Sequence, residues 1–152
     1  MYRDYLKDRI GSLIYITGTL LRCFSSQTFK EKNFELTPDQ YVLLSLLLEN
    51  EEIIYQRQLA EITFKDRANI SRIIEILHQK GFIEKVPDSH GRKIYKLVVT
   101  EKGKKTKDEI LNTDTKLRQI ITNNLSEEEL AITFNTLEKI NANIRDKVKL
   151  QI

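Results

Sequence analysis

The sequence of 152 residues has one cysteine, two prolines, five glycines and no tryptophan. A lone cysteine excludes a disulfide within the chain, which fits a reducing compartment. No apolar run approaches the roughly 18 residues that a membrane-spanning helix needs. The amino terminus, MYRDYLKDRIGS, is charged and lacks the apolar core of a signal peptide. These absences predict a cytoplasmic protein.

Motifs of catalysis are also missing. The sequence has no Ser-His-Asp signature and no glycine-rich phosphate loop, and its one cysteine and two histidines do not form a metal-binding spacing. We therefore expect no enzyme activity, no cofactor and no metal. His78 and His90 could each donate to a phosphate, or could simply be exposed to solvent. Cys23 has no neighbour in the sequence that would activate it, so we expect a buried, unreactive thiol.

The composition is that of a folded domain, with 40% hydrophobic and 31% charged residues, and the length suits a single domain, 1–152. The charges are segregated along it. Residues 55–105 hold 12 Lys or Arg against 6 Asp or Glu, whereas the rest of the chain holds 13 against 16. This leaves +6 in one segment and −3 outside it, as a phosphate-binding surface requires.

A short amphipathic helix is predicted inside the basic segment. Asp66 can cap its amino end, and Gly81 stands where a left-handed residue would end it. At about 100° per residue, four apolar side chains gather on one side, and the first turns of the other side are small or polar. The apolar side chains are Ile70, Ile73, Ile74 and Leu77; the free side includes Ala68, Arg72, Glu75 and Gln79, flanked by Asn69 and Ser71. Such a face can enter a major groove, although an ordinary solvent-exposed face would look similar.

A two-stranded hairpin is expected next. Residues 82–86 and 92–99 read as strands, and the turn residues between them place Asp88 to Lys93 at the tip. Adjacent Arg92 and Lys93 suit contact with a phosphate backbone, and arginine favours a narrow minor groove. A charged edge that resists aggregation is the alternative. A first helix is expected from about Gln56 to Phe64, just before the helix described above. The two helices, the turn between them and the hairpin together form a winged helix-turn-helix.

These segments resemble the MarR family of bacterial transcriptional regulators, with LTPDQYVLLSLL at 36–47, QLAEIT at 58–63, NISRIIEILHQKGFIEK at 69–85 and PDSHGRKIYKLVVTEKG at 87–103. One departure is Gly91, which stands where the family's wing commonly has an acidic residue before its arginine. The resemblance implies a mostly α fold with a small β-hairpin wing. The DNA-binding lobe would be 36–100 and the dimerisation helices 1–32 and 101–152. It also implies a homodimer and a small-molecule effector bound between the lobe and the terminal helices.

The flanking segments agree with dimerisation. A long helix is predicted from about Arg3 to Lys30, and capping boxes at Thr37 and Ser126 begin two further helices. Residues 53–54 could form a short strand beside the wing, and the body of the helix from Pro38 should be buried nearly all round. The terminal helices carry more apolar surface than one neighbour can cover, so we expect two copies to interlock.

The predicted function is sequence-specific binding of a pseudo-palindromic double-stranded DNA operator by a repressor. Arg72 and Asn69 would reach base edges, and Arg92 would enter the minor groove. The remaining predicted contacts, to phosphates or from the same exposed turn, are Gln56, Arg57, Arg67, Ala68, Ser71 and Lys93. Simple solvent exposure is the alternative for Gln56 and Arg57. A winged helix that binds proteins rather than DNA is the alternative function.

Overall fold

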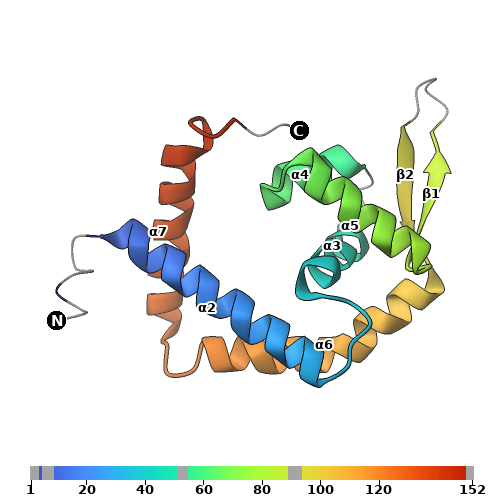
Figure 1. Ribbon diagram of the computed structural model, residues 1–152. Helices are drawn as coiled ribbons and strands as arrows, with labels where there is room; N and C mark the ends of the chain where they lie inside the picture. Colours follow the sequence, from blue (N-terminus) through green and yellow to red (C-terminus); the bar gives the residue numbers. More distant parts are fainter. Residues whose placement is uncertain (1–3, 5–8, 51–54, 89–93, 150–152) are drawn as a thin grey trace. The chain divides into compact units, whose positions relative to one another are not determined.

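The computed structural model describes residue 4 and residues 9–50, 55–88 and 94–149. Those ranges contain six helices and one antiparallel two-stranded sheet (Figure 1), which confirms the predicted fold class. In chain order the elements are α2 Ile10–Glu31, α3 Pro38–Glu49, α4 Gln56–Thr63, α5 Arg67–Gln79, β1 Ile83–Pro87, β2 Tyr95–Val99, α6 Glu101–Ile121 and α7 Glu127–Arg145. The strand predicted at 53–54 lies outside the described residues.

The internal contacts divide the chain into two units, Met1–Val42 and Leu43–Ile152. In the first unit Phe29 is buried against the rings of Phe34 and Tyr41, with ring centroids 5.2 and 5.8 Å apart. Thr37 then begins α3 with the predicted capping box. Its hydroxyl accepts from the Gln40 N–H at 3.3 Å, and the Gln40 side chain accepts from the Thr37 N–H at 3.1 Å. These reciprocal bonds satisfy two backbone donors that the helix leaves open.

The body of α3 is buried less evenly than expected. Leu43 and Leu44 are fully buried, whereas Val42 is 46% exposed. The prediction of burial nearly all round is therefore wrong at Val42, because an apolar residue on a helix is buried only where another element covers it.

In the second unit, α5 matches its sequence prediction at both ends. The Asp66 side chain accepts from the Asn69 N–H at 2.8 Å. Gly81 has a positive φ of 77°, and the Gly81 and Phe82 N–H groups donate to His78 and Leu77 carbonyls. This paired bonding at a left-handed residue ends the helix and turns the chain into β1. The four apolar residues of α5 are buried as predicted.

The hairpin β1–β2 follows directly and stands beside α5 (Figure 1). Its register pairs Ile83 with Val99 and Pro87 with Tyr95. Ile83 and Leu97 are buried, since alternate side chains of a strand point to one face and these face the helices. The hairpin is thereby attached to the core at its base.

The terminal helices expose most of their apolar side chains. Phe29 is the one buried residue of α2, and α7 has none. The large apolar residues of α7 that are exposed include Ile132, Phe134, Leu137 and Ile144. Cys23 is exposed as well, so the prediction of a buried thiol is wrong. Helical periodicity places Cys23 on α2 but does not specify whether another element covers that position.

Candidate nucleic-acid interface

The first turns of α5 present the side chains that the sequence assigned to DNA. Arg67, Ala68 and Arg72 are exposed, whereas Asn69 and Ser71 are half-buried. The arrangement follows from burial of the opposite face, because four buried apolar side chains fix the rotation of the helix about its axis. Two exposed guanidinium groups are thus carried by the first two turns of a rigid helix, where they could reach phosphates or base edges.

The amino end of α4 lies beside this turn. The Gln56 side-chain amide donates to the Ser71 hydroxyl, which joins α4 to α5. Arg57, with its side chain 81% exposed, pairs with Glu61 one turn later at 2.8 Å. The structure therefore brings Gln56 and Ser71 together, which the sequence did not predict, whereas Arg57 pairs with Glu61.

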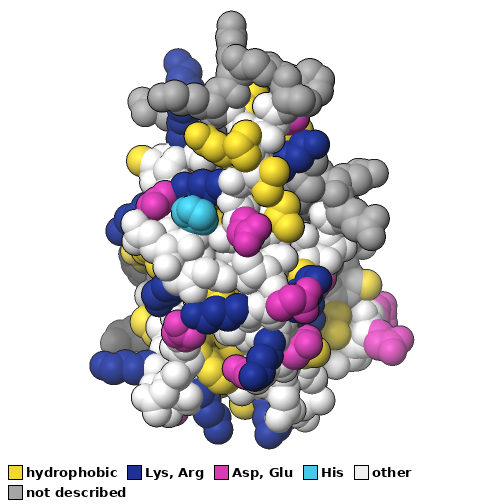
Figure 2. Space-filling model, turned by 90° about the vertical axis from the view of Figure 1, so that its right-hand side faces the viewer, with side chains coloured by type: hydrophobic (Ala, Val, Ile, Leu, Met, Phe, Trp, Pro, Cys, Tyr) yellow, Lys and Arg dark blue, Asp and Glu magenta, His cyan; other side chains and the backbone are white. Residues whose placement is uncertain are grey.

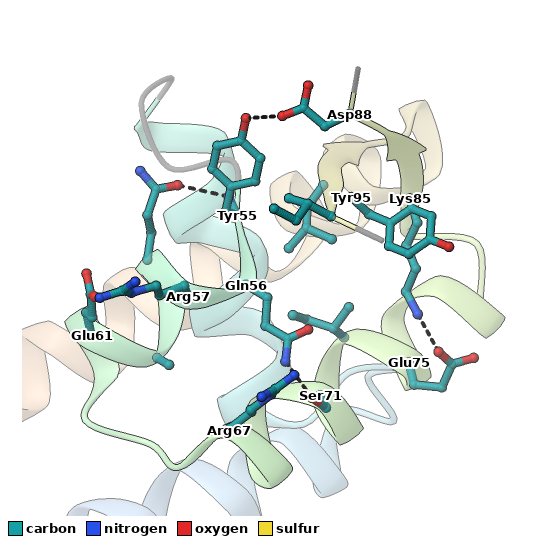
Figure 3. Close-up of a pocket in the computed structure, with 15 residues that line it drawn as sticks. Tyr55, Gln56, Arg57, Glu61, Arg67, Ser71, Glu75, Lys85, Asp88 and Tyr95 are labelled. Carbon is teal, nitrogen blue, oxygen red and sulfur yellow. Dashed lines mark hydrogen bonds and ion pairs between the residues drawn. The ribbon is translucent and has the colours of Figure 1, made fainter. Parts of the chain in front are cut away.

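A cavity of about 950 Å³ separates the two helices from the hairpin (Figure 3). Gln56, Arg67 and Ser71 lie together at one side of it, while Tyr55 and Asp88 meet at another. Apolar parts of the wall come from Ala60, Ile74 and Leu97, which are buried. Because side chains of the described residues do not fill this space, packing among them does not hold the Asp88 end of the hairpin against α4.

Two side-chain contacts bridge the cavity instead, one between Tyr55 and Asp88 and the other between Lys85 and Glu75. The Tyr55 hydroxyl donates to the Asp88 carboxylate, with 2.6 Å between Oη and Oδ2, and this bond raises the pKa of Tyr55 above its ordinary 10.0. The Asp88 N–H donates to the Ile94 carbonyl at 2.9 Å. Asp88 was expected at the tip of the wing. The structure instead places it at the base of the loop, with its side chain turned to α4.

The second bridge joins the middle of β1 to α5. Lys85 Nζ lies 2.5 Å from Glu75 Oε2, and the ammonium group lowers the pKa of Glu75 below its ordinary 4.5. Glu75 also accepts from the Gln79 side chain at 3.1 Å. Two of the side chains on the predicted free face of α5, Glu75 and Gln79, are thus engaged with one another and with the hairpin.

Charges of both signs cover the side of the molecule that carries the hairpin. Figure 2 shows Lys and Arg side chains interspersed with Asp and Glu, without one continuous basic patch among the described residues. Arg92 and Lys93, the predicted wing contacts, and His90 lie outside the described residues. His78 is exposed, and its Nδ1 lies 3.2 Å from the Ile83 carbonyl oxygen.

Tyr55 and Lys85 were not predicted as site residues, and Asp88 was predicted only as a residue of the wing tip. A signal existed for Lys85, since strand alternation puts it on the same face as Ile83, toward the helices. None existed for Tyr55 and Asp88, which are 33 positions apart. Among the described residues, no group of His, Cys, Asp and Glu side chains could hold a metal ion. No helix in the described ranges is long and apolar enough to cross a membrane.

Known proteins share both the sequence and this architecture. Residues 34–94 match the MarR family. The chain is 34% identical over 128 residues to YybA of Bacillus subtilis (strain 168), an uncharacterized HTH-type transcriptional regulator, and the match covers 84% of this chain and 85% of that protein. These matches extend well beyond the helix-turn-helix itself.

Solved structures agree. The transcriptional regulator SlyA superposes with a TM-score of 0.78 at 31% identity, covering 91% of this chain and 96% of that one. A MarR-family regulator from Listeria monocytogenes, solved with a 26mer DNA, gives a TM-score of 0.76 at 29% identity, covering 88% and 87%. Sequence, fold and the exposed face of α5 all lead to one conclusion. The chain belongs to the MarR family of DNA-binding, winged helix-turn-helix transcriptional regulators.

Proposed function

We propose that this protein is a cytoplasmic, homodimeric repressor that binds a pseudo-palindromic operator and releases it in response to a small effector. The DNA-binding part of this proposal rests on α5. Its Arg67 and Arg72 side chains are exposed, while its apolar face is buried. The Listeria monocytogenes relative was solved with a 26mer DNA, which supports double-stranded DNA as the partner of this chain as well.

Each predicted contact has a distinct role in this proposal. Arg72 and Asn69 read base edges in the major groove, from the first two turns of α5. Arg92 enters the adjacent minor groove, as its place in the wing sequence suggests. Phosphates are held from both helices and the wing, by Gln56, Arg57, Arg67, Ser71 and Lys93, while Ala68 leaves room for close approach.

The dimer is supported by the exposed apolar side chains of the terminal helices. Phe134 is 66% exposed and Ile132 is 58% exposed on α7, and Leu20 is 65% exposed on α2. Burying a large apolar side chain contributes about 1.5 to 3 kcal/mol. Covering these surfaces with a second copy would therefore stabilise the protein, and a two-fold axis would place two copies of α5 about 34 Å apart along DNA.

Selection of duplexes from a random pool tests this proposal directly. We expect an enriched motif with dyad symmetry whose half-sites are about 10 base pairs apart from centre to centre. The affinity of the protein for this duplex should fall steeply as the salt concentration rises, because each phosphate that the protein neutralises releases counterions. Absence of enrichment, together with weak binding that does not depend on salt, would contradict the proposal and favour a winged helix that binds proteins.

The effector is tested separately. Titration of the protein–operator complex with phenolic compounds and oxidants should find a compound that weakens operator binding. A compound acts by population shift only if it binds the DNA-free form more tightly than the DNA-bound form. The same compound should therefore bind less tightly when operator DNA is present, and equal affinity in both states would contradict this part of the proposal.

A further inference from the structure

Asp88 is fully engaged at the base of the wing. Its side chain is 8% exposed. One carboxylate oxygen accepts from the Tyr55 hydroxyl at 2.6 Å, and the other lies 3.9 Å from Lys96 Nζ on the opposite strand. Its backbone N–H closes the loop against the Ile94 carbonyl. Asp88 is the last residue before the wing loop. It follows β1 directly, contacts β2 through Lys96, and bonds to Tyr55, the residue before α4.

Tyr55 is a firm attachment point for this contact. It stands immediately before α4 with an extended backbone, and its N–H donates to the Gln58 side chain at 2.9 Å. A tyrosine side chain has only two rotatable angles, so fixing its ring and hydroxyl costs little conformational entropy. The position of the Tyr55 hydroxyl is thus determined by the start of α4, and it transmits that position to Asp88.

The cavity makes this contact important for the orientation of the hairpin. The hairpin is packed onto the core at Ile83 and Leu97, and Lys85 ties its middle to Glu75 of α5. Asp88 is three residues beyond Lys85, or about 10 Å along the strand. A hairpin held only at its base and middle could still pivot over the cavity, whereas a third attachment to α4 fixes its direction.

We propose that Asp88 and Tyr55 are positioning residues for DNA binding, which orient the wing relative to α4 and α5 through their hydrogen bond. This inference rests on the proposed DNA-binding function. Residues 89–93 join Asp88 to Ile94, so the orientation of the strand ends limits where those residues can reach.

The test measures affinity for the selected duplex with the full chain and two single substitutions. Tyr55→Phe removes one hydroxyl and leaves the ring, and Asp88→Ala removes the acceptor. If each leaves the wing correctly oriented only about a tenth of the time, affinity falls about tenfold, because apparent affinity scales with the competent fraction. Asp88→Asn keeps an acceptor oxygen for Tyr55 and should lose less affinity than Asp88→Ala.

Tyr95→Phe is the matched control, because Tyr95 lines the same cavity and its hydroxyl makes no hydrogen bond with a residue that the structure describes. It should bind the duplex as the parent protein does. Hydrogen exchange measured by NMR gives a second readout without DNA. In Tyr55→Phe the Asp88 amide should exchange faster than in the parent, whereas the Ile73 amide in α5 should exchange at the parent rate.

Unchanged affinity in Tyr55→Phe would overturn the inference, even if the melting temperature fell, because the bond would then be structural only. Lost affinity with unchanged exchange at Asp88 would also overturn it, since the hydroxyl would then act on DNA directly. If the parent protein binds no duplex, the proposed function fails instead. The exchange experiment would still report whether the Tyr55–Asp88 bond holds the wing.

Discussion

Gly103 in the first turn of α6 lies against the Phe82 backbone. A β carbon at Gly103 would come within 2.4 Å of the Phe82 carbonyl oxygen and within 2.6 Å of Val99 Cγ1. The same region is fastened by Thr100, whose hydroxyl accepts from the Gly103 N–H at 3.1 Å and lies 2.7 Å from the Gly81 carbonyl oxygen. The end of α5, the wing and the start of α6 therefore meet at a point where only glycine fits.

Gly103→Ala should consequently destabilise the protein by about 1 to 3 kcal/mol, because the added methyl group meets backbone atoms that cannot move aside cheaply. The usual effect in a helix is the reverse, a gain of up to about 1 kcal/mol. Gly11→Ala is the control, since nothing lies within 4 Å of its β-carbon position in α2. Urea unfolding followed by circular dichroism measures both, and equal stabilities would contradict the close contact.

Arg72→Ala should weaken specific operator binding by about 1 to 3 kcal/mol and relax the base preference at one position of each half-site. The reason is loss of a guanidinium that can bond two base-edge acceptors at once. Lys116→Ala removes an equal charge from an exposed position of α6 and should leave specificity intact. Fluorescence anisotropy on single-base operator variants measures this, and an unaltered base preference would exclude Arg72 as the reading residue.

Lys93→Ala should behave differently, because a lysine on a phosphate carries no sequence information. Affinity for the operator and for unrelated duplexes should fall by similar factors. The slope of log affinity against log salt should become shallower by about one unit. A loss confined to the operator would show that Lys93 contacts a base instead.

Phe134→Glu should give a monomer at micromolar concentration. Phe134 is 66% exposed on α7, and a charge placed there would be buried without a partner if a second copy covered the helix. Asn135→Glu introduces the same charge at the adjacent position, which points elsewhere on the helix, and should leave the dimer intact. Sedimentation velocity distinguishes the two, and a dimeric Phe134→Glu variant would place the interface on other residues.

The Glu75–Lys85 pair should make stability depend on acid pH. The folded-state pKa of Glu75 lies below its ordinary 4.5 because the Lys85 ammonium favours the carboxylate. The contribution of the ionised Glu75 to the free energy of unfolding is therefore present above pH 4.5 and is lost as the pH falls through the folded-state pKa. Between about pH 5 and about pH 3 the urea midpoint of the parent should fall more than that of Glu75→Gln. Lys85→Gln should remove the same part of the pH dependence, and parallel curves for all three proteins would contradict the pairing.

Local signals in the sequence predicted most helix ends, although α2 begins at Ile10 after a non-helical Arg9 and not at Arg3 as expected. The caps predicted at Thr37, Asp66 and Ser126 each bond to the backbone N–H three residues on. Such bonds depend only on residue types at short spacing, as does the left-handed turn at Gly81. The buried face of α5 followed from helical periodicity for the same reason.

Predictions failed where a second element had to be known. Whether Val42 or Cys23 is buried depends on what lies over one side of a helix, and periodicity does not contain that information. Asp88 was read as a turn residue because aspartate favours turns, yet the same short carboxylate also suits a buried acceptor for a phenol hydroxyl. The wing contacts of Arg92 and Lys93 stay predictions from the sequence.

The amino-acid sequence alone determined the family of this protein, the order of its elements, and the face of α5 that is free to meet DNA, since all three depend on short-range patterns. Only the tertiary structure decided how α4 is joined to α5, through Gln56 with Ser71, and how the wing is held, through Tyr55 with Asp88 and Lys85 with Glu75. Partners 10 to 33 positions apart meet only after the core has packed, so no local spacing could specify these pairs.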